Sequence, residues 1–193
     1  GLDLAYGDSS GFGRPAPNLR RAGIAAAADE LGIPLADFES GREVSFAGSP
    51  SLKRFLVAEG VLGADGLVSV AKMKTHGFQR ITGAVKNQLG CVPGLAKAEL
   101  HLRLPEPADF ARMLVALNLL LRPRLFVMDG VVAMERNGPR GGDPVAAGVI
   151  LLSRDPVALD ATFCRLVGLD PRLAPTNVEG ALHGLGTWRE EEM

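Results

Sequence analysis

Residues 66–94, GLVSVAKMKTHGFQRITGAVKNQLGCVPG, carry the pattern that decides how this sequence folds. An apolar run over Gly66–Ala71 predicts a buried strand, and a segment rich in cations and glycines follows it at once. Its basic side chains are Lys72, Lys74, His76, Arg80 and Lys86. Cations crowded at the end of a strand repel one another unless an anion lies among them. A Gly-rich turn can also offer backbone N–H groups to a ligand, so this segment is where we expect a functional site.

On both sides of this segment, expected strands alternate with expected helices. The expected strands are Leu2–Tyr6, Gly66–Ala71, Leu125–Met128 and Val145–Ser153, with one or two more in Leu35–Ala47 and a polar loop over Glu135–Pro144. The expected helices are Leu19–Leu31, Ile81–Leu89, Pro107–Leu121, Pro156–Val167 and a short one near Val178–His183. This alternation predicts an α/β layered fold with a largely parallel or mixed sheet flanked by helices.

Length and composition bound the class of protein. A chain of 193 residues fits one domain, so we expect a single α/β domain over residues 1–193. A net charge of -1 and 5% aromatic residues argue against a nucleic-acid partner. The lack of a long apolar run or signal peptide argues against a membrane, and two cysteines suggest a reduced, cytoplasmic setting. A start at Gly1 that leads almost directly into a strand predicts a fragment lacking an N-terminal segment.

The turn Gly7–Gly13 follows the first expected strand and precedes a helix. Such a turn can wrap an anion, although no Gly-Lys-Ser/Thr follows to make it a P-loop. The candidate cofactor-binding residues here are Gly7, Asp8, Ser9 and Ser10. The alternative is a tight connection with no ligand, because glycine serves turns more often than ligands.

The cationic segment supplies the candidate catalytic residues, His76 and Lys86. His76 titrates near neutrality, and lysines around it would favour its neutral, basic form, so it is the candidate acid–base group. Lys72, Lys74 and Asn87 are candidate cofactor-binding residues, of which the lysines would hold carboxylate or phosphate oxygens, while Gly83 would let the backbone approach the ligand. The alternative is a solvated set of lysines around a surface turn.

Carboxylates follow in the second half of the chain. Asp129 is expected at the C-terminal end of a strand, where open α/β sheets bind ligands, and is a candidate cofactor-binding residue. A magnesium site using Asp129 or Asp143 is the alternative, but their spacing is not diagnostic, and no metal ligands are assigned. Asp155 is expected as a helix N-cap. Asp160 interrupts an apolar run and needs a partner, for which we expect a lysine of the cationic segment.

The cysteine beside this segment, Cys91, has two interpretations. Nearby cations would make it reactive if they lowered the pKa of its thiol. More often such a cysteine is a small buried hydrophobic residue. Two cysteines cannot by themselves ligate an iron–sulfur cluster.

Three blocks of sequence together resemble the domain of unknown function 362 family. They are residues 6–11 (YGDSSG); residues 72–76 (KMKTH) with 83–87 (GAVKN) and Gly90; and Asp129-Gly130 with 137–139 (NGP) and 153–160 (SRDPVALD). The resemblance covers nearly the whole chain. Because members are often linked to ferredoxin-like iron–sulfur modules, it implies a ferredoxin-like redox partner. Members usually also have a segment upstream of the first strand. Glu135-Arg136 departs from the small residue expected before Asn137.

A fainter resemblance is to the lactate racemase family. Its nickel-pincer site uses a histidine and a lysine separated much as His76 and Lys86 are, with a Pro-Gly after them that Pro93-Gly94 matches. The strand-end Gly-Thr-His of that family is matched only by Gly7-Asp8-Ser9, so a catalytic histidine is missing. The resemblance therefore implies a similar fold and site location without racemase activity.

Three functions remain open from the sequence. The leading one is an enzyme domain that binds an anionic small molecule or an unknown cofactor at Lys74, His76 and Lys86, with the Gly7–Gly13 turn and Asp129 as walls. The second is a non-catalytic module that docks an iron–sulfur electron-transfer partner through the basic loop. The third is a scaffold in which contacts such as Lys86 with Asp160 are structural.

Overall fold

The computed structural model describes residues 1–11 and 13–193, which fold as two compact units. The first unit comprises Gly1–Ala47, Lys53–Asp65 and Leu89–Arg103; the second comprises Gly48–Leu52, Gly66–Gln88 and Leu104–Met193. The single domain expected from the length of the chain stays a prediction.

The first unit combines short helices with a β-hairpin. Its elements are α1 (Pro15–Arg21), α2 (Ile24–Glu30), β1 (Gly41–Ser45), β2 (Arg54–Ala58), α3 (Glu59–Leu62), α5 (Ala96–Arg103) and all but the first residue of η1 (Gln88–Cys91). The single helix expected over Leu19–Leu31 is wrong, because Gly23 takes a left-handed conformation (φ 76°) and divides α1 from α2. The strand expected over Leu2–Tyr6 is reduced to one bridge between Tyr6 and Leu35. Pro34 has no N–H with which to extend that ladder.

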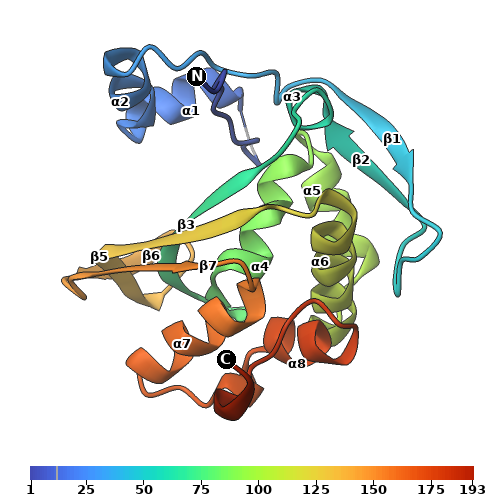
Figure 1. The fold of residues 1–193 in the computed structure, drawn as a ribbon, viewed down its shortest axis with the longest axis vertical. Helices are drawn as coiled ribbons and strands as arrows, with labels where there is room; N and C mark the ends of the chain where they lie inside the picture. The colour runs from blue at the N-terminus through green and yellow to red at the C-terminus, as the bar shows by residue number, and fades with distance from the viewer. Residues whose placement is uncertain (12) are drawn as a thin grey trace. The chain divides into compact units, whose positions relative to one another are not determined.

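The second unit contains a mixed sheet, which confirms the predicted α/β class (Figure 1). Its strands are β3 (Val68–His76), β4 (Arg80–Thr82), β5 (Leu125–Asn137), β6 (Gly141–Val145) and β7 (Val149–Ser153). Their order is β4–β3–β5–β6, and β7 also pairs with β5. The pair β3–β5 is parallel and the other pairs are antiparallel. The helical elements are α4 (Ala84–Asn87), α6 (Pro107–Leu121), α7 (Pro156–Leu166), η2 (Pro171–Leu173), α8 (Pro175–Leu182) and η3 (Glu190–Glu192).

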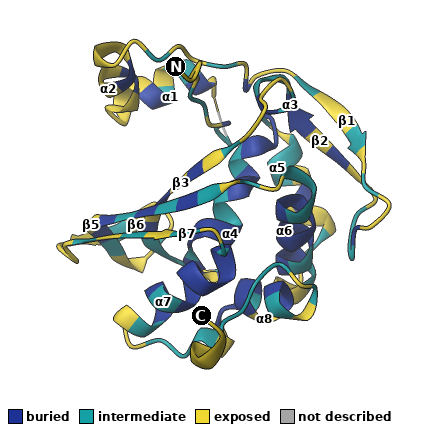
Figure 2. Ribbon diagram, in the orientation of Figure 1, coloured by how far each residue is buried: buried dark blue, intermediate teal, exposed yellow. Residues whose placement is uncertain are grey.

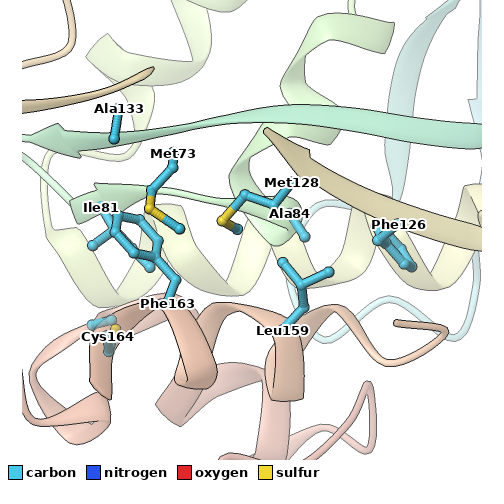
Figure 3. Packing of buried hydrophobic residues seen from close by; sticks show 10 residues of the cluster. Met73, Ile81, Ala84, Phe126, Met128, Ala133, Leu159, Phe163 and Cys164 are labelled. Atoms are coloured by element: carbon cyan, nitrogen blue, oxygen red, sulfur yellow. The ribbon is translucent and has the colours of Figure 1, made fainter. Parts of the chain in front are cut away.

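The core of the second unit lies between the strands and α7. Met73 and Met128 point from the sheet toward Leu159 and Phe163 of α7, as Figure 3 shows. Burial alternates along β3, where Ser69, Ala71 and Met73 are buried and the residues between them are exposed (Figure 2). The outward-facing apolar residues of β3 and β7 are Val68, Val70, Ile150 and Leu152.

The structure confirms two predicted elements and corrects two others. Helix α6 has the predicted bounds, and the side chain of Asp155 caps α7 by accepting from the N–H groups of Val157 and Ala158. The helix expected over Ile81–Leu89 begins later than predicted, with α4 at Ala84 and η1 directly after it, because residues 80–82 pair with β3 as β4. The loop expected over Glu135–Pro144 is wrong. It is a hairpin of β5 and β6 in which Glu135 opposes Asp143.

Candidate functional site

One pair of predicted site residues is brought together by the sheet. Lys72 and Asp129 are register partners on β3 and β5, and Lys72 Nζ lies 2.5 Å from Asp129 Oδ2. Lys72 Nζ also donates to the carbonyl of Val132, and the N–H of Val131 donates to Asp129 Oδ1. The hydrogen bond from Lys72 lowers the pKa of Asp129 below its ordinary value. Both side chains therefore already compensate each other's charge.

The pairing between β3 and β5 shifts immediately beyond this ion pair. Lys72 opposes Asp129, whereas Lys74 opposes Met134, so β5 has an irregular stretch between the two positions. Such irregularities redirect side chains and are frequent next to binding sites. Lys74 and His76 lie two residues apart on β3 and leave the strand on the same side.

His76 lies where β3 ends and its ring caps the turn that follows. Its Nδ1 accepts hydrogen bonds from the backbone N–H of Phe78 (3.1 Å) and of Gln79 (3.2 Å). Chain direction then reverses into β4, where Arg80 is the register partner of His76. The imidazole thus has a defined orientation relative to the backbone.

The start of α4 holds a carboxylate that belongs to the protein itself. Asp160 is fully buried and accepts from the N–H groups of Ala84 (2.5 Å) and Val85 (3.1 Å). Our expectation of a lysine partner was wrong, because backbone amides at the end of a helix satisfy this carboxylate instead. A Cβ at Gly83 would lie 2.1 Å from Asp160 Oδ1, so Gly83 makes room for Asp160. Burial raises the pKa of Asp160 to about 7, although the two N–H groups oppose that change.

Asn87 fastens the other end of α4. Its Nδ2 donates to Ser69 Oγ (3.0 Å) and to the carbonyl of Val70 (3.1 Å) on β3. The amide of Asn118 donates to the carbonyl of Val85. The backbone is therefore fixed on both sides of Lys86. Asn87, a candidate cofactor-binding residue, uses its amide to hold α4 on the sheet.

In the first unit, Ser9 fastens the start of the Gly-rich turn. The N–H of Ser9 donates to the carbonyl of Gly90 (3.0 Å), and Ser9 Oγ accepts from the N–H of Gly94 (2.9 Å). Lys97 donates to the carbonyl of Ser9. Ser9 is buried, and a Cβ at Gly90 would lie 2.4 Å from Asp8 Oδ1. These contacts bind the turn to the segment around α5. Phe12, which belongs to the same turn, lies outside the described residues.

Lys97 is a half-buried cation that no sequence motif indicates, since its partner Ser9 lies 88 residues earlier. Burial lowers the pKa of Lys97, and the nearby charge of Asp8 opposes that effect. Burial, with a smaller contribution from Asp8, raises the pKa of Cys91 to about 12. The thiol is therefore protonated at neutral pH. Our hypothesis of a reactive Cys91 is wrong, and the alternative of a small buried residue is confirmed.

The candidate residues divide between the two units. Gly7, Asp8, Ser9 and Ser10 belong to the first unit, and Lys72, Lys74, His76, Lys86, Asn87 and Asp129 belong to the second. The gathering of the two sets around one ligand stays a prediction. Asp143, the other carboxylate considered for magnesium, forms an ion pair with Arg136 at 3.0 Å.

Two absences concern residues 1–11 and 13–193. In these ranges no cluster of three or more His, Cys, Asp and Glu side chains has an arrangement suited to a metal ion. None of the helices in these ranges combines the length and the apolar character needed to cross a membrane.

Comparison with known proteins places the chain in a family. The family model described as domain of unknown function (DUF362) matches residues 1–165. The thylakoid-associated protein sll1697 of Synechocystis sp. is 34% identical over 171 residues, which is 88% of this chain and 53% of that protein. The chain thus spans about half the length of this curated relative. No solved structure matches. Neither the family model nor the curated relative supports the resemblance to lactate racemase. The match over most of the chain shows that it belongs to the domain of unknown function 362 family.

Proposed function

We propose that the second unit is an enzyme domain that binds an anionic small molecule through Lys74, His76 and Lys86. The observation that carries the proposal is that all three basic side chains are half-buried on backbone that hydrogen bonds hold in place. Lysines of an ordinary surface turn are mostly exposed on mobile backbone. Half-buried cations on fixed elements suit a site that is organised before its ligand arrives.

The charges of the site favour a carboxylate or a phosphate as the group that is bound. Lys74 and Lys86 each bring an ammonium donor, and such charge-assisted hydrogen bonds are stronger than neutral ones. Lys72 contributes less in this proposal, because Asp129 already compensates its charge. The same donors would stabilise negative charge that develops on a substrate oxygen during a reaction.

A cytoplasmic location belongs to the proposal as well. Cys91 and Cys164 are free and buried, which is compatible with a reducing compartment. The curated relative is named as thylakoid-associated. The location of the present chain is therefore best tested directly, by fractionating cells that express it and probing the soluble and membrane fractions.

The test is Lys86→Ala, with the exposed Lys53→Ala as the matched control. Inorganic phosphate and a small dicarboxylate are titrated into each protein by calorimetry, and thermal unfolding is followed in parallel. We expect Lys86→Ala to weaken binding at least about tenfold, which corresponds to one charge-assisted hydrogen bond, with the melting temperature almost unchanged. Lys53→Ala should bind normally. A large loss of stability with intact binding would contradict the proposal.

Salt separates this function from docking of a ferredoxin-like partner. Contacts between exposed charges weaken steeply as ionic strength rises, whereas half-buried contacts are screened much less. We expect anion binding to decline only modestly with added sodium chloride. A steep decline, together with ferredoxin binding that Lys72→Ala and Lys74→Ala weaken, would favour the docking function instead.

A further inference from the structure

The contacts of His76 determine where its proton resides. Its Nδ1 faces two backbone N–H donors, from Phe78 at 3.1 Å and from Gln79 at 3.2 Å. A neutral imidazole has one nitrogen that donates and one that accepts. A proton on Nδ1 would face both N–H groups and remove their acceptor. The neutral ring therefore carries its proton on Nε2.

We infer that His76 is held as the Nε2–H tautomer and serves the ligand as a hydrogen-bond donor, not as a proton acceptor. This inference rests on the anion-binding function proposed above and makes it more specific. It differs from the role expected from the sequence, in which the neutral ring acts as a base. The nitrogen turned away from the turn already carries a proton in the neutral ring, so it has no lone pair for a second one.

The turn that fixes this tautomer is itself well supported. Gln79 is fully buried, and its side-chain amide donates to the carbonyl of Pro107 (2.9 Å). The ring of Phe78 packs edge-on against Phe110, with the centroids 5.3 Å apart. Both N–H donors therefore belong to residues whose side chains are anchored on α6 or beside it. Swinging the turn away from the imidazole would break these contacts as well.

A fixed donor at His76 narrows the class of ligand. In this proposal, His76, Lys74 and Lys86 all present hydrogen-bond donors to one ligand. A fitting ligand must therefore carry hydrogen-bond acceptors. A deprotonated carboxylate or phosphate supplies several acceptor oxygens and no donor, so it fits this site. A substrate that must lose a proton to His76 does not fit it. The proposed role of His76 is thus to bind and orient a ligand oxygen.

The tautomer can be measured without any ligand. The three histidines are His76, His101 and His183, and His76→Asn identifies the signal of the first. In the 15N-labelled chain, long-range 1H–15N correlation at a pH where the ring is neutral distinguishes a protonated from an unprotonated ring nitrogen. We expect the protonated shift for Nε2 and the unprotonated shift for Nδ1. The reverse pattern, or an average of the two, would overturn the inference.

Two matched substitutions separate the cap on the turn from the donor to the ligand. In His76→Asn, the side-chain oxygen can take the place of Nδ1 and accept from the turn, but no donor reaches the position of Nε2. In His76→Gln, the longer amide can donate from the position of Nε2, but the turn loses its acceptor. We expect His76→Asn to keep the melting temperature and to weaken phosphate binding about tenfold. His76→Gln should bind within about threefold of the unaltered protein and melt earlier.

The outcomes distinguish this inference from the proposed function. Equal loss of binding in both variants would overturn the donor role, since only one of them lacks a donor at that position. If the unaltered protein binds neither phosphate nor a dicarboxylate, the proposed function and the donor role both fail. The 15N shifts decide the tautomer independently of that result.

Discussion

Two aspartates of the second unit, Asp160 and Asp129, differ in burial, in partner and in the direction in which their pKa is changed. Asp160 is fully buried and is held by backbone N–H groups at the start of α4, and burial raises its pKa to about 7. The side chain of Asp129 remains 41% exposed and is held by Lys72, which lowers the pKa of Asp129. The difference shows that the partner and the solvent, more than the residue type, decide whether a carboxylate builds the fold or takes part in a charged surface.

The largest expected effect concerns pH. The pKa of Asp160 is raised from 3.8 to about 7, so the folded protein retains a proton that the unfolded chain loses. Its unfolding free energy should therefore decrease as the pH rises from about 4 to about 7, by at most about 4 kcal/mol. Asp160→Asn should flatten this slope, as measured by urea unfolding across the pH range.

Asp129→Asn is the control of opposite sign. The lowered pKa of Asp129 adds stability that is present above its ordinary pKa and is lost as the pH falls through the lower, folded value. Removing this carboxylate should leave the slope between about pH 4 and about pH 7 in place. An unchanged slope in Asp160→Asn would contradict the assignment.

The next largest effect is the loss of stability when the buried carboxylate is removed. Asp160→Ala leaves the N–H groups of Ala84 and Val85 without their acceptor in a buried site. We therefore expect the free energy of unfolding, measured with urea, to fall by about 3 kcal/mol. Asp129→Ala removes a half-exposed carboxylate and should cost less than about 1 kcal/mol. Equal costs would mean that the two carboxylates do not differ as described.

Gly83→Ala tests the same site by adding a single methyl group. A Cβ there would lie 2.1 Å from Asp160 Oδ1, so the carboxylate must move away from α4, at a cost of about 2 kcal/mol. Gly77→Ala is the matched control in the same segment, because a Cβ there meets nothing within 4 Å. Thermal unfolding of both variants is the measurement. A neutral Gly83→Ala would show that this glycine is not needed by Asp160.

The smallest effect concerns the exposed ion pair. Lys72→Ala removes the partner of Asp129. Because both side chains are half-exposed, we expect the free energy of unfolding to fall by less than about 1 kcal/mol. Added salt should shrink this difference further. A loss of several kcal/mol at high salt would show that the pair contributes to the core.

The sequence predicted those features that a local pattern encodes. Helix α6 was predicted with its exact bounds because apolar residues recur at helical spacing between Pro107 and Pro123. The partners of Asp160 could not be predicted, because they are backbone amides that any residue could supply. The hairpin of β5 and β6 was missed because its residues are largely exposed and its apolar alternation is weak. Lys97 was missed because its partner Ser9 is distant in the chain.

The most direct test of the proposed site adds inorganic phosphate to the 15N-labelled chain and follows the Nε2 signal of His76. We predict a saturable shift of this signal in the unaltered protein and in Lys53→Ala, and its loss in Lys86→Ala. A His76 signal that does not move while phosphate reaches saturating concentration, or that moves equally in Lys86→Ala, would contradict the account.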